Sequence, residues 1–246
     1  MNFRSFSICF MALPFFYKED LIATDTSIVL DEAASKHIVL VLRMQNGEQL
    51  QLTNGKGDIV TVEITDNNRK KCTVRNVEKF KIQNSKFKIT IAISPVKNTT
   101  RFEWFLEKAT EIGVTNIIPL ICERTEKQNF RHDRMNAILI SAMLQSQQCW
   151  LPVLHEAIRF GDLMMRQFDN SSRFIAHCED DENKILLHQQ ITRSSNQLIC
   201  IGPEGDFTTG EIEMAIRQNF IPVSLGNNRL RTETAGVVAA VLLGSK

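Results

Sequence analysis

The chain has 246 residues, of which 43% are hydrophobic and 23% are charged, and its formal net charge is +1. This is the composition of an ordinary folded protein, so disorder is not expected, and the near-zero charge excludes a chain that is basic throughout. The length allows one large domain or two smaller ones.

The N-terminus carries Arg4 followed by an apolar run, a pattern that weakly resembles a signal peptide. Charged residues follow this run directly, without a small-residue cleavage site, and we therefore expect a cytoplasmic protein. Both Met1 and Met11 stay open as the native start. No stretch approaches the roughly 20 apolar residues that a membrane span needs, so no membrane association is expected.

Alternating polar and apolar residues in the first third of the chain predict short β-strands. Turn signals separate them at Asn46-Gly47 and in the NGKG sequence at 54–57. The segment 32–44 predicts a short helix that leads into a strand. Short strands joined by tight turns suggest a small barrel. The predicted strands are 27–30, 48–54, 58–65 and 70–80.

Positive charge is concentrated between Asp66 and Lys88, where there are eight basic residues and two acidic ones. Such a stripe can bind phosphates even when the whole chain is near neutral. It is also consistent with a solvated strand edge whose lysines prevent aggregation. The stripe alone leaves both interpretations open.

Beyond the polar run 81–86, which we interpret as a linker, strands alternate with helices and predict a parallel α/β sheet. Thr100 with Glu103, and Thr208 with Glu211, fit capping boxes at the starts of two helices. The expected strands are 87–94, 116–122, 173–178, 198–202 and 221–226, and the expected helices are 100–112, 133–147, 209–219 and 234–244.

The common signatures of nucleotide binding and hydrolysis are missing. The sequence contains no G-x-G-x-x-G after the first α/β strand, no Walker loop, no G-x-S-x-G and no H-E-x-x-H. The five histidines show no ligand spacing. The six cysteines include no C-x-x-C and several lie in apolar runs, so we expect buried thiols in a reducing compartment and no metal site.

Two loops at predicted strand ends carry the strongest signals. In the first, 201–207 (IGPEGDF), two glycines flank a proline and let the backbone approach a flat ligand such as adenine. The second, 225–236, holds arginines, threonines and a glutamate before a helix. Ligands bind at the carboxyl ends of strands in open α/β sheets, so together the loops suggest one pocket. A capped turn and a surface pair between Arg231 and Glu233 are the alternatives.

The sequences IGPEGDF and SLGNNRLRTETAG resemble the signature loops of the RsmE-type 16S ribosomal RNA uridine-N3 methyltransferases, a family of the SPOUT superfamily. Further similarity lies in 97–120, 145–152 and 37–50 and at Glu123-Arg124. One departure is the segment after Gln145-Ser146, where many relatives carry a basic residue and this chain has none. Its Trp150 could stack on a base, or pack in the core.

The resemblance implies an α/β fold with a C-terminal SPOUT domain (87–246) containing a deep trefoil knot, after a PUA-like RNA-binding barrel (11–80). It implies S-adenosylmethionine as cofactor. The cofactor-binding residues that it implies are Gly202, Glu204, Gly205, Leu225, Gly226, Leu230 and Thr234.

The resemblance also implies a mechanism and partners. Arg231 would stabilise charge on the uracil oxygens, while Glu233 would position Arg231 or accept the N3 proton. The expected partners are the 16S RNA of the small ribosomal subunit and a second copy of the chain. The last helix and the 133–147 helix are the candidates for the interface between the copies, and the alternative is that both bury against their own sheet. The alternatives are a SPOUT enzyme acting on a ribose 2′-hydroxyl, and a non-catalytic RNA-binding assembly protein. The expected RNA-binding residues are Arg43, Arg69, Lys70, Lys71 and Arg124.

Overall fold

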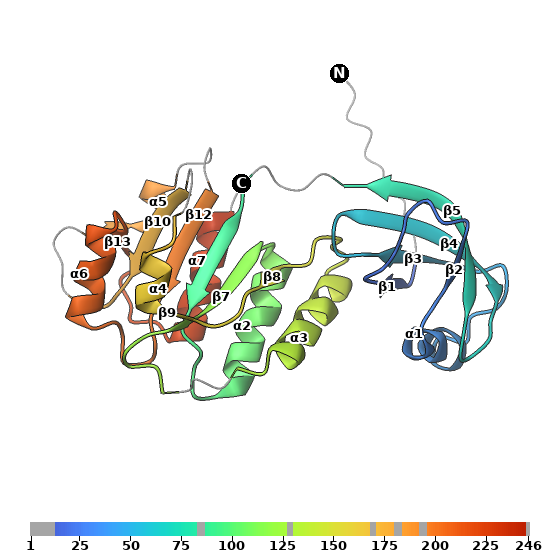
Figure 1. The fold of residues 1–246 in the computed structure, drawn as a ribbon, viewed down its shortest axis with the longest axis horizontal. Helices are drawn as coiled ribbons and strands as arrows, with labels where there is room; N and C mark the ends of the chain where they lie inside the picture. Colours follow the sequence, from blue (N-terminus) through green and yellow to red (C-terminus); the bar gives the residue numbers. More distant parts are fainter. Residues whose placement is uncertain are drawn as a thin grey trace, which may run out of the picture. The chain divides into compact units, whose positions relative to one another are not determined.

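The computed structural model describes residues 13–82, 87–126, 130–167, 171–179, 184–191 and 196–244. The chain divides into two compact units, residues 1–84 and 85–246, shown as a ribbon in Figure 1. Most of the predicted linker, residues 83–86, lies outside the described residues, as do Met1 and Met11.

The first unit is a five-stranded sheet in the order β1-β3-β4-β5-β2. All pairs are antiparallel except β1 with β3. Alternate side chains of the strands, among them Leu50, Leu52 and Val60, form the core of the unit. The four predicted strands are confirmed, and β1 was not predicted. The bounds are β1 Phe15–Tyr17, β2 Ser27–Val29, β3 Gln49–Thr53, β4 Asp58–Asp66 and β5 Thr73–Lys81.

The segment after β2 is helical, and the strand predicted to end it is wrong. Helix α1 (Glu32–Lys36) begins at Asp31, whose carboxylate accepts a hydrogen bond from the Ala34 amide at 2.8 Å. The chain then continues as a turn of π-helix, His37–Val41, in which only Ile38 is buried. Arg43, at a positive φ of 57°, follows this turn.

The second unit is an all-parallel sheet in the order β11-β13-β10-β12-β6-β7-β8. Strand β9 pairs with β7, as β8 does. The five predicted strands correspond to β6, β7, β10, β12 and β13. The other three strands have two residues each, too few for a recognisable pattern. The bounds are β6 Ile89–Ile93, β7 Asn116–Ile121, β8 Val153–Leu154, β9 Ile158–Arg159, β10 Ser171–Ala176, β11 Ile185–Leu186, β12 Asn196–Ile201 and β13 Ile221–Ser224.

Helices cover both faces of this sheet, as the parallel pairing requires. One apolar core holds Ile91 and Ile93 of β6 against α2, α3, α5 and α7, and the other holds Ala92 against α4 and α6. Figure 1 shows α2 and α7 side by side next to the sheet. The bounds are α2 Thr99–Ile112, α3 His132–Gln145, α4 Phe160–Met164, α5 Leu187–Gln190, α6 Thr209–Arg217 and α7 Thr232–Gly244.

The two predicted capping boxes have different outcomes. Thr208 and Glu211 form the predicted box at the start of α6. The box predicted for Thr100 and Glu103 is wrong, because Asn98 caps α2 by accepting a hydrogen bond from the Thr100 amide at 3.0 Å. Glu103 instead forms a two-point ion pair with Arg134 of α3.

After β13 the chain crosses back to the middle of the sheet, where α7 packs against β6, β12 and α2. Gly236 allows this close approach. A Cβ atom at this position would lie 2.6 Å from Cε2 of Phe105 and 2.7 Å from Cδ1 of Ile93. The absence of a side chain therefore sets the spacing between α7 and the layer beneath it. No helix among the described residues is long and apolar enough to cross a membrane.

Candidate active site

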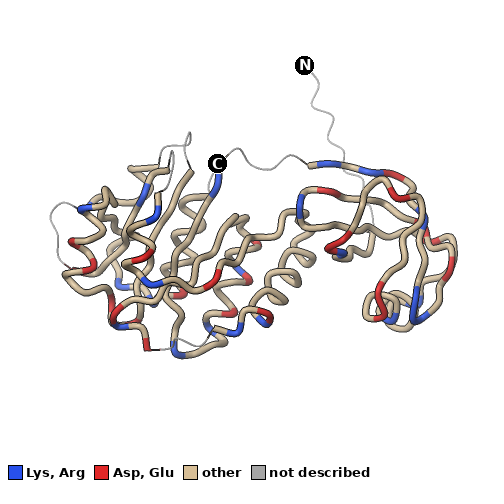
Figure 2. The backbone as a smooth tube through the Cα atoms, viewed as in Figure 1, with Lys and Arg blue, Asp and Glu red and all other residues tan. Residues whose placement is uncertain are grey.

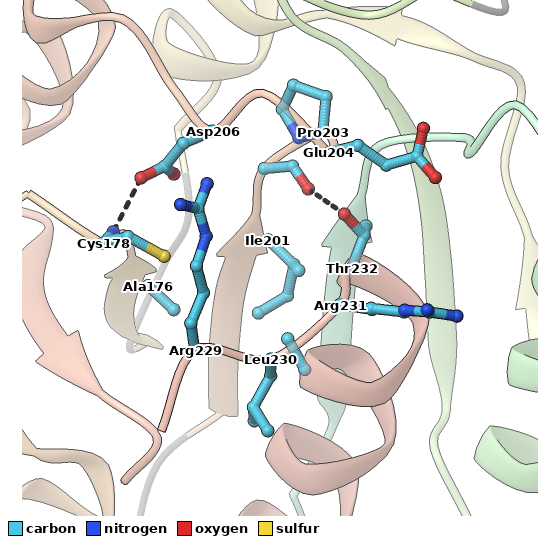
Figure 3. A pocket seen from close by; sticks show the side chains of 12 residues that line it. Ala176, Cys178, Ile201, Pro203, Glu204, Asp206, Arg229, Leu230, Arg231 and Thr232 are labelled. Atoms are coloured by element: carbon cyan, nitrogen blue, oxygen red, sulfur yellow. Dashed lines mark hydrogen bonds between the residues drawn. The ribbon is translucent and has the colours of Figure 1, made fainter. Parts of the chain in front are cut away.

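The two loops predicted from the sequence meet at the carboxyl edge of the second sheet. Strands β10, β12 and β13 end there, and between the loops lie two adjoining cavities of about 370 Å³ each. This size is typical of sites for small ligands. Both cavities are lined by Ala176, Cys178, Arg229, Leu230 and Ala235, so we treat them as one cleft, part of which is shown in Figure 3.

Asp206 gives the first loop a fixed shape. Its φ is +64°, and both carboxylate oxygens accept backbone N–H groups, Oδ2 from Cys178 at 2.7 Å and Oδ1 from Phe207 at 2.8 Å. Its own amide donates to the Pro203 carbonyl at 2.9 Å. These bonds tie the loop to the end of β10, which forms the far wall of the cleft.

Gly202 is required by close packing. A Cβ atom on this residue would lie 3.0 Å from the ring of Phe207 and 3.2 Å from its backbone nitrogen. Phe207 is fully buried in the core beside α4 and α6. The glycine therefore lets the first loop fold back over its own aromatic anchor.

Arg124, in the loop after β7, holds the first loop from outside. Its Nη1 donates to the carbonyl of Gly205 at 2.8 Å and to that of Phe207 at 3.3 Å. The neighbouring Glu123 amide donates to Glu211 Oε1 at 2.9 Å, which attaches the same segment to the start of α6. Arg124 was predicted to bind RNA. In the structure its guanidinium supports the cleft, and an RNA contact stays a prediction.

The second loop is joined to the first by one buried hydrogen bond. The hydroxyl of Thr232, the first residue of α7, donates to the Gly202 carbonyl at 3.0 Å, as Figure 3 shows. On the strand side, Ser224 Oγ donates to the Gly226 carbonyl at 2.9 Å, and Gly226 has a φ of +144°. Both ends of the second loop are thereby fixed around the cleft.

Most of the predicted site residues line the cleft. From the first loop these are Gly202 and Glu204, and from the second Leu225, Gly226, Leu230 and Arg231. Three predicted residues are not among the lining residues: Gly205, Glu233 and Thr234. The structure adds Arg229, which lines both cavities and was not singled out from the sequence, where it is one more charge in an exposed loop.

Glu233 lies behind the cleft and not at its surface. Only 5% of the residue is exposed, and its Oε1 lies 3.8 Å from Nε of Arg101 on α2. Its other oxygen, Oε2, is buried without a hydrogen-bond partner among the described residues. The predicted contact between Glu233 and Arg231 is not among the ion pairs and hydrogen bonds of the described residues, and the carboxylate faces Arg101.

The charged groups of the cleft surround an exposed thiol. Burial raises the pKa of Cys178, as does the negative charge of Asp206, while Arg229 and Lys184 act in the opposite direction. The thiols of Cys122 and Cys200 lie in the core, where burial raises their pKa further. No three His, Cys, Asp or Glu side chains within the described ranges are grouped so as to hold a metal ion.

The predicted RNA-binding residues of the first unit come together at one end of its sheet. Arg69, Lys70 and Lys71 are exposed in the turn between β4 and β5. Within that turn Asn67 donates to the side chain of Gln45 at 3.3 Å, which brings the turn beside the segment that carries Arg43. Figure 2 marks the lysines and arginines along the backbone of this unit. The turn thus exposes three of the eight basic residues of the sequence stripe.

Comparison with known proteins agrees with this architecture. A family model described as an RNA methyltransferase domain matches residues 83–244, and one described as an RNA methyltransferase PUA domain matches residues 30–75. The ribosomal RNA small subunit methyltransferase E of Rickettsia conorii is 32% identical over 222 residues, which cover 87% of this chain and 90% of that protein.

Solved structures give the same result. A crystal structure from Porphyromonas gingivalis, described as a probable rRNA-methyltransferase, has a TM-score of 0.84 and 38% identity over 93% of this chain and 95% of its own. The ribosomal RNA small subunit methyltransferase E of Neisseria gonorrhoeae, solved bound to S-adenosyl methionine, has a TM-score of 0.82 and 27% identity over 93% of this chain and 95% of its own.

The fold and its cleft define an RNA methyltransferase of the SPOUT class, a knotted α/β domain preceded by a PUA-like barrel. In such a knot the last part of the chain passes through a loop formed earlier, an exception to ordinary chain topology. The return of α7 past the Gly202 loop is the corresponding part of this chain. The chain belongs to the RsmE family of ribosomal RNA small subunit methyltransferases.

Proposed function

We propose that this protein transfers a methyl group from S-adenosylmethionine to N3 of a uridine in the 16S RNA of the small ribosomal subunit. The observation that carries the proposal is the junction of the IGPEGDF and LRTETAG loops around one cleft at the carboxyl edge of the sheet. The family membership and the cofactor bound by the Neisseria gonorrhoeae relative support it.

The cleft fits the proposed cofactor. Apolar side chains of Ala176, Ile201, Leu230 and Ala235 can cover the faces of an adenine ring, while the backbone of both loops offers donors and acceptors for its edge. We assign cofactor binding to the seven residues implied by the resemblance. Two of these, Gly205 and Thr234, are not among the residues that line the cleft, and would contribute from the layer behind the lining residues. When bound, the cofactor supplies an electrophilic methyl group on a sulfonium.

Arg231 is the proposed residue for the reaction at the base. Uridine N3 carries a proton, and removing it places negative charge on the neighbouring oxygens, which a fixed guanidinium stabilises. Arg231 lines the cleft, and Figure 3 shows its side chain directed away from Arg229. Glu233 does not line the cleft in this structure; for it we propose proton acceptance through its unpartnered Oε2, in place of a contact with Arg231.

The proposed division of labour follows the domains expected from the sequence, with RNA binding in 11–80 and methyl transfer in 87–246. The exposed cluster Arg69–Lys71, together with Arg43, would hold RNA phosphates flanking the target. Because the target base has to leave any stacked arrangement before it reacts, this grip would keep the RNA in place while the base enters the cleft. We also propose that the reaction takes place in the cytoplasm.

We further propose that the active form is a homodimer. Helix α7 is apolar nearly all round, yet Val241 is 46% exposed on it, and Trp104 of the adjoining α2 is 43% exposed. Most of the helix is buried within its own unit, and the apolar side chains that stay exposed on it and beside it support an interface between subunits. The other helix expected at the interface, α3, packs against α2 within the unit. Sedimentation velocity tests the proposal, which a monomer at micromolar concentration would contradict.

The function is tested with undermethylated small subunits and a cofactor carrying a labelled methyl group, followed by nucleoside analysis. The wild-type chain should yield N3-methyluridine. Arg231→Ala should abolish transfer while leaving cofactor affinity within about twofold, and Arg217→Ala, a surface arginine of α6, should leave both unchanged. Label in ribose would establish the 2′-hydroxyl alternative, and a chain that binds no cofactor would establish the non-catalytic one.

A further inference from the structure

We propose that Arg229 binds the α-carboxylate of the methionine part of the cofactor. The inference rests on the proposed function, because it assumes that S-adenosylmethionine occupies the cleft. It deepens that function by assigning one chemical group of the donor to one side chain. Arg229 projects from the loop between β13 and α7, directly before Leu230.

Two other charged residues of the cleft, Asp206 and Lys184, are already engaged. Both oxygens of Asp206 accept backbone N–H groups, and Lys184 Nζ donates to the carbonyl of His177 at 3.1 Å. Across the described part of the chain, the Arg229 guanidinium takes part in none of the hydrogen bonds and ion pairs found. An arginine carries five N–H donors, so a cation placed in a cleft without a partner is available to an anionic ligand.

The position of Arg229 also suits this role. Arg229 lines both cavities, so it lies where a ligand that extends from one into the other has to pass. Figure 3 shows its side chain extending between Cys178 and Asp206 on one side and Ile201 on the other, whereas Arg231 points to the right, away from Arg229. The positive charge is close enough to lower the pKa of Cys178 against the effect of burial. The two arginines therefore face different parts of the site.

The charges of the donor also favour this assignment. S-adenosylmethionine carries two positive groups, the sulfonium and the α-ammonium, and one negative group, the α-carboxylate. A guanidinium repels the first two and matches the third in charge and in its two-point geometry. Of the three charged groups on the donor, only the carboxylate gains from lying against Arg229. An RNA phosphate is the other anion that could reach an arginine here, and the experiment separates the two.

The test measures binding without RNA, by calorimetry, for S-adenosylhomocysteine and for 5′-methylthioadenosine, which keeps the nucleoside but lacks the amino-acid part. Arg229→Ala should weaken S-adenosylhomocysteine about 10- to 100-fold and leave 5′-methylthioadenosine within about twofold. Arg229→Lys should recover part of the loss, because it keeps the charge. Arg217→Ala, at the surface of α6, is the matched control and should change neither affinity.

Three results would overturn the assignment. Equal losses for both ligands would mean that Arg229 contacts the nucleoside or shapes the loop. An unchanged affinity for S-adenosylhomocysteine, with weaker binding of ribosomal RNA, would mean that the arginine binds a phosphate instead. If the wild-type chain bound neither ligand, the proposed function would fail together with this inference. Thermal unfolding of each ligand-free variant shows whether the fold is intact.

Discussion

The hydroxyl of Thr232 donates a buried hydrogen bond to the backbone carbonyl of Gly202, with 3.0 Å between the two oxygens. Thirty positions separate these residues in the sequence. The bond joins the start of α7 to the loop after β12, so the two walls of the cleft are coupled and not independent. Each wall has its own second support, Arg124 for the first loop and the Ser224 turn for the other.

Replacing Thr232 by valine should weaken both the fold and cofactor binding. Valine keeps the shape of the side chain but leaves the buried Gly202 carbonyl without its donor, which costs about 1–3 kcal/mol. Chemical denaturation should show a loss of this size, and calorimetry should show lower affinity for S-adenosylhomocysteine. Thr232→Ser keeps the hydroxyl and serves as the control. Equal behaviour of the valine and serine variants would show that the hydrogen bond is not what matters.

Replacing Gly202 by alanine should disturb the cleft more than the fold. The new methyl group would lie 3.0 Å from the Phe207 ring and 3.2 Å from a backbone nitrogen, and the backbone has no room to yield without moving the loop. We expect at least about a tenfold loss in cofactor affinity. Gly210→Ala is the control, since nothing lies within 4 Å of the added atom in α6. Wild-type affinity in Gly202→Ala would contradict the packing argument.

Arg124→Ala tests whether this arginine supports the loop or binds RNA. Losing its bonds to the carbonyls of Gly205 and Phe207 should loosen the first loop and lower cofactor affinity about tenfold. RNA affinity, measured by filter binding without cofactor, should stay within about twofold. The reverse pattern, with RNA binding reduced and cofactor binding intact, would favour the role predicted from the sequence.

Changing Arg69, Lys70 and Lys71 together to glutamine should reduce the salt dependence of RNA binding. Each phosphate contact contributes about 0.7–0.9 to the slope of log K against log salt, so three lost contacts lower it by about 2–3. Lys108→Gln is a suitable control, because Glu107 and Glu111 already hold that lysine at 2.7 and 3.0 Å. A slope equal to that of the wild type would show that the exposed cluster contacts no phosphate.

The sequence predicted best where local chemistry determines the structure. The strand of 196–201, its glycine-containing loop and the Thr208–Glu211 box follow one another along the chain, and all are found. The cap of α2 was assigned to the wrong residue, since Asn98 and Thr100 can both start a helix and only the backbone geometry selects one. The helical turn at His37–Val41 was partly predicted as strand, because a run of β-branched residues favours strands until tertiary packing overrides them.

Other features depend on contacts between distant residues, which no local pattern contains. Arg124 and Gly205 are 81 positions apart, and nothing near Arg124 in the sequence indicates that its guanidinium meets that carbonyl. The same holds for Glu233, whose pairing with Arg101 depends on how closely α7 approaches α2. The knot was expected from the resemblance alone, because periodicity predicts elements but not the path between them.

The shape of the cleft depends on Gly236, a buried residue that does not line it. It lies one turn after Thr232 on α7, and the contact between its bare backbone, Phe105 and Ile93 sets how deeply the helix sits. A methyl group there would act as a wedge, lifting the first turn of the helix and drawing the Thr232 hydroxyl off the opposite wall. A substitution at Gly236 would therefore create a steric clash between α7 and α2, and its first effect would be to open the cleft. All side chains that face the ligand would be unchanged in such a variant.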